Sequence, residues 1–363
     1  QKMGSWGYSI DATPFNCLDY RSKEPSLTYK GKPFAVKISP YSLGCDAHAE
    51  LVVASTINEL ETCDCHGKIL LLRGEICAEQ LMPKNFVFYN PDHHKRIYAL
   101  LEEKQPKAII TATNKNPQMV GNIYPFPLIN DGDFDIPSVY CTDIIGEEIA
   151  ANAGETFRLK VEAKRIPTTA CNVIARINPQ AQNKITICGH IDAVEDSPGA
   201  SDNASGVVVM LLFAELLKDY QGKMGIEIIA FNGEDHYSVG GQMDYLKRYN
   251  DCLKQNLLAI NIDDVGYFKG NTAYSFYDCS PEIQQKAKAT FSKYYGLKEG
   301  EQWYQGDHMI FVQSQIPTMA ITSDKVSELM ATITHSPKDT PEIVDCDKLV
   351  ELACALEGLV KTF

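Results

Sequence analysis

The sequence lacks an apolar run long enough to cross a membrane, an excess of basic residues and any C-x-x-C pair. Its most apolar stretch, GVVVMLLFAELL from Gly206, has about half of the ~20 residues that a membrane-spanning helix needs. This stretch predicts a buried helix, and no membrane partner is expected. The chain has 34 lysines and arginines against 47 aspartates and glutamates, so its net charge is −13. That charge repels phosphate backbones, so nucleic acid is not an expected partner.

Twelve cysteines are scattered along the chain. Several of them, such as Cys171 and Cys188, lie in apolar, strand-like runs, where a free thiol behaves as a small hydrophobe. Unpaired cysteines favour a reducing compartment, so a cytoplasmic location is expected. A secreted or periplasmic location stays open, because Gln1 is not a natural start and a preceding segment is expected to have been cut away.

The second half of the chain has the pattern of an α/β fold. From Lys184 onward, short apolar runs such as KITICG, IEIIAFN and LLAINID alternate with longer amphipathic segments. Such alternation predicts a mixed, mostly parallel sheet that is sandwiched by helices. Helices are expected at residues 203–220, 240–249 and 345–363.

The first half has a different pattern. Short strand candidates, GKILLLRG, NFVFYN, KAIITATN and IPSVYCT, surround a helix candidate near residues 96–104. They predict a smaller, β-rich domain at residues 45–163, inserted into a catalytic domain formed by residues 1–44 and 164–363. YSIDATPFNCLDY and KPFAVKIS, which precede the insertion, are expected to join the later sheet.

Acids and histidines stand where the predicted strands end. In an open parallel sheet, ligands bind at these carboxyl ends. Besides the residues at the strand ends, two candidates lie elsewhere: Asp202 just before the apolar helix, and His335 in THSPKDT. The residues at the three strand ends are His190 and Asp192, Glu234 and Asp235, and Asp263 and Asp264.

Each of these residues has an ordinary explanation when it is taken alone. Asp202 is typical of a helix N-cap, and Pro337 and Asp339 are ordinary loop formers. The joint pattern favours another explanation. If the side chains converge, at least three carboxylates and two imidazoles lie together, and cations would relieve their repulsion. Mixed histidine and carboxylate ligands suit zinc, and a pair of zinc ions sharing a carboxylate is a recurrent arrangement for hydrolysis.

Five segments resemble, in order, the signature blocks of the M28 family of dizinc exopeptidases, which includes bacterial leucyl-type aminopeptidases. They are GHIDAV, GASDNASG, AFNGED, NIDDVG and THSPKDT. In addition, HGKILLLRGEI, PKAIITATN and DIPSVYCT resemble a protease-associated (PA) domain, which members of this family often carry. The resemblance therefore implies a zinc exopeptidase domain with an inserted PA-like domain.

The resemblance also implies five ligands for two Zn²⁺ ions. His190 and Asp263 would bind one ion, Asp235 and His335 the other, and Asp202 would bridge them. The chain departs from many relatives at position 235, where they have glutamate.

Further roles follow from the same resemblance. Glu234 matches the general base, and Asp192 matches an acid that helps orient the site from behind the ligands. Several relatives have an oxyanion-assisting tyrosine where this chain has Thr334. A D-H pair that relatives place near the substrate pocket assigns Asp307 and His308 to substrate binding.

The implied activity is that of a zinc-dependent aminopeptidase. A hydroxide bridging two zinc ions would attack the N-terminal peptide bond of a peptide with a free N-terminus, and Glu234 would pass the proton to the departing amine.

Three alternatives are weighed against it. A carboxypeptidase of the same family needs an arginine for the substrate carboxylate, and the only arginine after Gln180 is Arg248. A glutaminyl cyclase-like transferase needs a single zinc ion. With His190 the chain has five proposed ligands, which is more than one zinc ion requires. A binding module without activity is disfavoured because neither a ligand nor the base is lost. The side-chain preference and the oligomeric state have no signal in the sequence.

Overall fold

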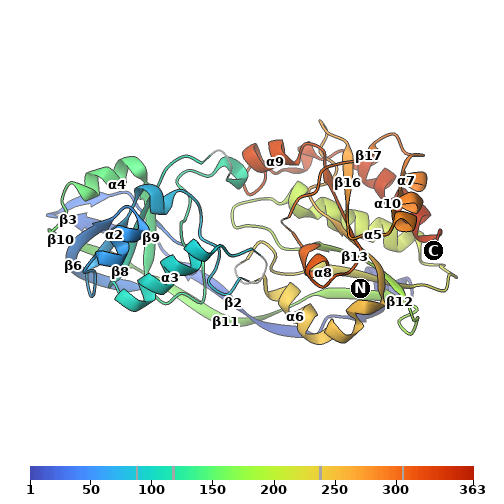
Figure 1. Ribbon diagram of the computed structural model, residues 1–363, viewed down its shortest axis with the longest axis horizontal. Helices are drawn as coiled ribbons and strands as arrows, with labels where there is room; N and C mark the ends of the chain where they lie inside the picture. Colours follow the sequence, from blue (N-terminus) through green and yellow to red (C-terminus); the bar gives the residue numbers. More distant parts are fainter. Residues whose placement is uncertain (87–88, 117–118, 237–238, 305) are drawn as a thin grey trace. The chain divides into compact units, whose positions relative to one another are not determined.

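The computed structural model describes residues 1–86, 89–116, 119–236, 239–304 and 306–363, with the side chain of Asn122 left out. The chain forms two compact units, Gln1–Phe15 together with Ala170–Phe363, and Asn16–Thr169 (Figure 1). It passes between the units in β2 (Pro14–Ser22) and β11 (Ala163–Cys171), which pair with each other as a two-stranded sheet.

The large unit is built on an eight-stranded sheet with the order β1-β12-β14-β13-β15-β18-β16-β17. The central strands β13, β14, β15 and β18 run parallel to one another, whereas β12 and β16 run antiparallel to their neighbours in the centre. The predicted mixed, mostly parallel sheet is therefore confirmed. Its strands are β1 (Ser9–Asp11), β12 (Val173–Ile177), β13 (Lys184–His190), β14 (Gly225–Phe231), β15 (Asn256–Ile262), β16 (Thr272–Tyr277), β17 (Leu297–Glu299) and β18 (Thr318–Ser323).

Helices cover both faces of this sheet. They are α1 (Lys2–Ser5), α5 (Gly206–Leu216), α6 (Gly240–Tyr249), α7 (Pro281–Phe291), α8 (Met309–Gln313), α9 (Val326–Thr332) and α10 (Cys346–Val360), with the short helices η3 (Ala200–Ser205), η5 (Asn250–Gln255) and η6 (Pro341–Ile343). Among the residues that the structure describes, no helix is both long enough and apolar enough to span a bilayer.

Strand β14 shows how the two faces are assigned, because successive side chains of a strand point to opposite sides. Ile226 and Ala230 lie in the apolar core that also contains residues of α5, α7 and α10. Phe231 points the other way and packs edge-on against Tyr245 of α6, which in turn contacts Phe311 of α8. A strand that is buried on both sides needs a continuous apolar run, and IEIIAF supplies it.

The smaller unit has its own eight-stranded sheet, in the order β4-β3-β10-β6-β7-β8-β9-β5. Strand β10 alternates between buried and exposed residues, which packs Phe157, Leu159 and Val161 into an apolar core. The strands are β3 (Ser26–Tyr29), β4 (Lys32–Phe34), β5 (Lys37–Ile38), β6 (Cys45–Ala54), β7 (Ile69–Leu72), β8 (Ala108–Thr113), β9 (Ser138–Thr142) and β10 (Thr156–Val161). The helices are α2 (Ile57–Thr62), η1 (Gly74–Cys77), α3 (Asp92–Lys104), η2 (Val120–Asn122) and α4 (Asp143–Ala150).

The boundary between the units differs from the expected one. Residues 16–44 group with the smaller unit, because β3 pairs with β10 and β5 pairs with β9. KPFAVKIS was expected to join the later sheet. This prediction is wrong, because the segment forms β4 and β5 of the smaller sheet. From the preceding segment, Ser9–Asp11 does join the large sheet, as the edge strand β1 beside β12. The strand candidate NFVFYN falls partly on residues 87–88, outside the described residues.

Candidate metal centre

The predicted site residues meet at the carboxyl ends of three neighbouring strands. His190 is the last residue of β13, and Asp263 directly follows β15. Glu234 and Asp235 lie in the turn after β14. Because β13 pairs with both β14 and β15, these strand ends lie side by side. The sheet topology alone therefore brings four of the candidates together at the carboxyl ends of these strands.

Asp202 lies between two imidazoles. Its Oδ1 is 2.9 Å from Nε2 of His190, and its Oδ2 is 3.0 Å from Nε2 of His335. Nε2 of His190 is also 3.4 Å from Oδ1 of Asp263, and Nε2 of His335 is 2.8 Å from Oδ1 of Asp235. The donor atoms form two groups that share Asp202, and within each group they lie within 4.8 Å of one another. The structure thus brings together the five residues that the resemblance assigns.

A close approach of α5 to the end of β15 fixes the segment that carries Asp202. Nδ2 of Asn203 donates to the carbonyl oxygen of Ile262 at 2.8 Å, and its Oδ1 accepts from the N–H of Gly206 at 3.1 Å. A Cβ at position 206 would lie 2.7 Å from that carbonyl oxygen, so the approach requires glycine. Asp202 is held beside Asp263 for this reason.

Asp192 organises the turn after β14 through hydrogen bonds to the main chain. Its Oδ1 accepts from the N–H groups of Gly233 (2.7 Å) and Glu234 (3.2 Å), and its Oδ2 accepts from the N–H of Asp235 (3.0 Å). Nδ1 of His236 lies 2.9 Å from the same Oδ2. Asp192 therefore orients the turn that bears Glu234 and Asp235.

Asp339 plays a similar part for Asp202, although its sequence context resembles an ordinary loop. Its side chain is fully buried, with Oδ1 accepting from the N–H of Ser201 at 2.7 Å and Oδ2 accepting from the N–H of Asp202 at 3.1 Å. Residue spacing in the sequence does not reveal this contact, because its partners are main-chain groups 137 and 138 residues away. The position of Asp339 in the THSPKDT block, four residues after His335, was the only available hint.

The electrostatics of the site favour bound positive charge. Burial alone lowers the pKa of His190, but the carboxylates of Asp263 and Asp202 outweigh it and raise that pKa well above its usual value. Burial raises the pKa of Glu234, and the neighbouring carboxylate of Asp235 adds to this shift. The raised pKa values of His190 and Glu234 both follow from several carboxylates packed into one buried site.

Three buried atoms of the cluster test whether it fits a metal. Nε2 of His190, Oδ2 of Asp235 and Oδ1 of Asp263 make no hydrogen bond of acceptable geometry with the residues that the structure describes, although Nε2 of His190 lies 2.9 Å from Oδ1 of Asp202. Buried polar atoms normally have a partner, so such atoms need an explanation. Imidazole nitrogen and carboxylate oxygen are donors that zinc accepts, so these residues fit a metal centre.

Asp307 and His308 directly precede α8 and are fully buried. Oδ1 of Asp307 accepts from Nε2 of Gln242 at 2.6 Å, and burial raises the pKa of this aspartate to about 8. Nε2 of His308 lies 2.9 Å from the carbonyl oxygen of Trp303, whose ring packs against the imidazole. Their assignment to substrate binding stays a prediction, and their burial favours a supporting role.

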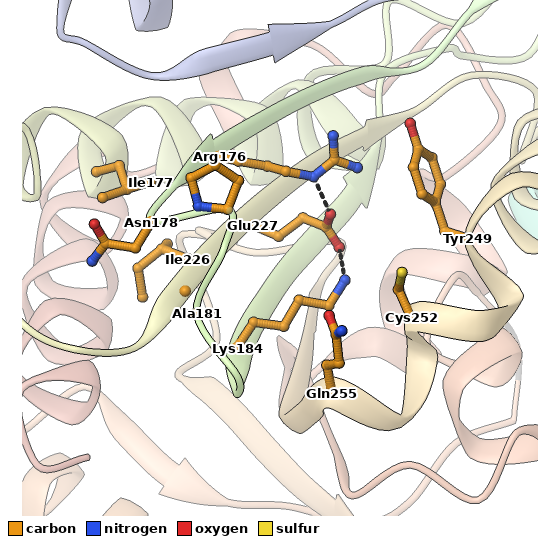
Figure 2. A pocket seen from close by; sticks show the side chains of 12 residues that line it. Arg176, Ile177, Asn178, Ala181, Lys184, Ile226, Glu227, Tyr249, Cys252 and Gln255 are labelled. Carbon is orange, nitrogen blue, oxygen red and sulfur yellow. Dashed lines mark hydrogen bonds and ion pairs between the residues drawn. The ribbon is translucent and has the colours of Figure 1, made fainter.

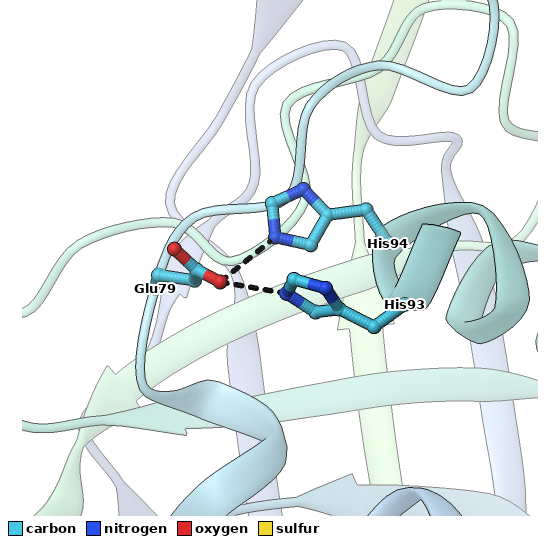
Figure 3. A group of neighbouring side chains, drawn as sticks. All are labelled: Glu79, His93 and His94. Atoms are coloured by element: carbon cyan, nitrogen blue, oxygen red, sulfur yellow. Dashed lines mark hydrogen bonds and ion pairs between the residues drawn. The ribbon is translucent and has the colours of Figure 1, made fainter. Parts of the chain in front are cut away.

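A second histidine and carboxylate cluster lies in the smaller unit (Figure 3). Oε1 of Glu79 is 2.7 Å from Nε2 of His93 and 3.2 Å from Nε2 of His94. The N–H of Met82 donates to Nδ1 of His94 at 3.1 Å, so the neutral ring carries its proton on Nε2. The protonated Nε2 has no lone pair for a metal, and the lone pair of Nδ1 already accepts the N–H of Met82. The cluster is therefore a hydrogen-bonded group.

A pocket opens at the amino ends of β13 and β14, at the other end of the strands from the candidate centre (Figure 2). Glu227 on its wall is buried and accepts from Nε of Arg176 and from Nζ of Lys184, both at 2.6 Å. It also accepts from the hydroxyl of Tyr245 at 2.7 Å. Because the carboxylate of Glu227 is fully engaged by these three donors, this pocket has the character of a structural junction.

The large unit is an α/β unit that carries a cluster of carboxylates and histidines at its strand ends. The comparisons with known proteins specify the family. Residues 172–359 match Peptidase family M28. This match covers more than half of the chain, which therefore belongs to that family.

Individual relatives agree with this assignment. The chain is 24% identical over 294 residues to the "Probable lipoprotein aminopeptidase LpqL" of Mycobacterium tuberculosis, covering 78% of this chain and 54% of that protein. It is 25% identical over 298 residues to "Aminopeptidase YwaD" of Bacillus subtilis, covering 79% of this chain and 60% of that protein. The chain thus spans less than two thirds of the length of these relatives.

A solved structure shares the fold along nearly the whole chain. BSAP, titled a zinc aminopeptidase from Bacillus subtilis, superposes with a TM-score of 0.73 at 22% identity, covering 99% of this chain and 86% of that one.

Proposed function

We propose that this chain is a zinc-dependent aminopeptidase that hydrolyses the N-terminal peptide bond of peptides through a two-ion centre. The observation that carries the proposal is the pair of donor groups sharing Asp202, with buried donor atoms that make no hydrogen bond of acceptable geometry with the described residues. The names of LpqL, YwaD and BSAP support an aminopeptidase, and that of BSAP supports zinc.

Five side chains would hold the ions. One ion would have His190, Asp202 and Asp263, and the other Asp202, Asp235 and His335. Bound Zn²⁺ supplies Lewis acidity, which makes water a better nucleophile near neutral pH and polarises a carbonyl group. The aspartate at position 235 is compatible with this proposal, because its Oδ1 already lies 2.8 Å from Nε2 of His335.

Glu234 would act as the general base. It stands beside the proposed ligand Asp235 but belongs to neither donor group. Its carboxylate would take the proton of the attacking water and deliver it to the departing amine. Asp192 would keep this carboxylate in place by holding the main-chain N–H groups of the same turn.

A substrate with a free N-terminus is supported by the names of LpqL and YwaD, both of which are named aminopeptidases. A carboxypeptidase is less well supported. Nε of Arg248 donates to Asp244 at 3.0 Å, and its Nη2 donates to the carbonyl oxygens of Thr13 and Pro14. This arginine is therefore already engaged. A single-zinc transferase would leave one of the two donor groups without a role.

The test is hydrolysis of a panel of aminoacyl-nitroanilides alongside the same panel with acetylated amines. We expect cleavage of the free-amine compounds alone, and loss of that cleavage after treatment with a chelator. Cleavage of the acetylated compounds alone would exclude an aminopeptidase, and activity unchanged by exhaustive chelation would exclude the metal centre.

A further inference from the structure

Ser201, Asp264 and Thr334 form a buried hydrogen-bonded triad in the large unit. Oγ of Ser201 donates to Oδ1 of Asp264 at 2.8 Å, and Oγ1 of Thr334 donates to Oδ2 of the same carboxylate at 3.3 Å. The three residues are 0%, 7% and 3% exposed, respectively. Each carboxylate oxygen thus accepts one hydroxyl proton in a place that excludes water, where such bonds are strong.

Each member of the triad is the immediate chain neighbour of a proposed ligand. The neighbours are Asp202, Asp263 and His335, in the same order. The hydrogen bonds of the triad join segments that lie 63 and 70 residues apart in the chain. A bond between two such neighbours limits how far the adjoining ligands can separate. The triad therefore restrains three of the segments on which the metal centre depends.

The same contacts give Thr334 a role of its own. Its hydroxyl is buried and donates to Asp264, so it is directed into the protein and not towards a substrate.

We propose that Asp264 is a positioning residue of the metal centre, which holds the ligand-bearing segments at Asp202, Asp263 and His335 through the hydroxyls of Ser201 and Thr334. The inference rests on the proposed ligand set. It predicts that loss of either hydroxyl weakens metal binding although no ligand is touched, since partners behind the ligands commonly affect affinity by about 10- to 100-fold.

The experiment measures metal affinity in the full chain by competition with a chelator, using Zn²⁺ and Co²⁺. Thr334→Val removes the hydroxyl and keeps the shape of the side chain, whereas Thr334→Ser restores a hydroxyl. Ser201→Ala tests the other bond independently and serves if Thr334→Val does not fold. Thr332→Val is the matched control, because the hydroxyl of Thr332 is exposed and donates only to the carbonyl of Glu328 in its own helix.

We expect Thr334→Val and Ser201→Ala to bind at least one ion about tenfold or more weakly, with an altered visible spectrum of the Co²⁺ form. Thr334→Ser and Thr332→Val should match the parent in both measurements. Parent-like affinity and spectrum in both Thr334→Val and Ser201→Ala would overturn the inference and leave the proposed function standing. A parent chain that binds no ion at all would overturn both.

Discussion

At the scale of single residues, the candidate centre depends on carboxylates with different tasks. Asp202 faces two imidazoles, whereas Asp192 and Asp339 accept main-chain N–H groups of the segments that carry Glu234 and Asp202. Buried carboxylates of the second kind stabilise a backbone conformation and need no metal. A substitution at each kind of position should therefore have a different signature.

Glu234→Gln tests the proposed base. The substitution removes the basic oxygen and keeps the size of the side chain, so metal content should equal that of the parent, whereas turnover should fall by at least about 10²-fold. Metal analysis and steady-state kinetics on the same preparation check this outcome. Turnover close to that of the parent would remove Glu234 from the role of base.

Asp192→Asn tests the positioning of that base. One carboxylate oxygen is replaced by an NH₂ group, which cannot accept from the main-chain N–H groups of the turn. We expect activity to fall by about 10- to 100-fold, together with weaker metal binding. Asp196→Asn, an exposed acid of the same segment, is the control and should behave like the parent. Equal behaviour of the two variants would contradict the positioning role.

The resemblance of five segments to the M28 signature blocks allowed the five proposed ligands to be selected from the sequence. Of these, only His190, Asp235 and Asp263 lie where strands of the parallel sheet end, and such ends converge. Asp339 and Asp264 could not be assigned in this way. Their partners are main-chain N–H groups and hydroxyls distant in the chain, and such contacts leave no spacing in the sequence.

At the scale of secondary-structure elements, Glu227 joins several parts of the large sheet. It lies on β14 and accepts from Arg176 of β12, Lys184 of β13 and Tyr245 of α6. Burial raises the pKa of Glu227, but Lys184, Tyr245 and Arg176 outweigh it, so that the pKa lies below its usual value. The ionised form is thus the one that stabilises the fold.

Glu227→Gln should lower the free energy of unfolding at pH 7 by about 3–5 kcal/mol, because two partly buried cations lose their counter-charge. A carboxyl whose pKa is lowered on folding contributes its stability above its unfolded pKa of about 4.3. That contribution disappears as the pH falls through the lowered folded value, so the difference between variant and parent should shrink below about pH 4.

Urea unfolding with a chelator present throughout, at pH 7 and near pH 3.5, measures this difference without a contribution from bound metal. Glu215→Gln, at an exposed glutamate of α5, is the control and should leave stability unchanged at both values of pH. A difference for Glu227→Gln that does not depend on pH would contradict the assignment of the stabilising charge.

Elements with strong periodicity were predicted close to their observed bounds. The helix expected at 240–249 is α6, and the one expected at 345–363 is α10, Cys346–Val360. The edge strands β4 and β5 were assigned to the wrong sheet, because a strand such as β5, with two residues, has too little periodicity to show which sheet it joins.

At the scale of the whole molecule, the two units have separate apolar cores, and the five proposed ligands all lie in the large unit. A ligand that binds only the folded state stabilises it by about 4 kcal/mol at a thousandfold excess over its Kd. Chelation is therefore expected to lower the melting temperature of the large unit and to leave that of the smaller unit unchanged. Calorimetry with and without a chelator, followed by re-addition of Zn²⁺, checks this. An equal shift of both units, or no shift, would contradict the assignment.

The most direct test of the two-ion centre is an anomalous difference map, measured at the zinc absorption edge on crystals grown with Zn²⁺. The account predicts two peaks, one on each side of the Asp202 carboxylate, the first next to His190 and Asp263 and the second next to Asp235 and His335. A single peak, or none at these side chains, would contradict it.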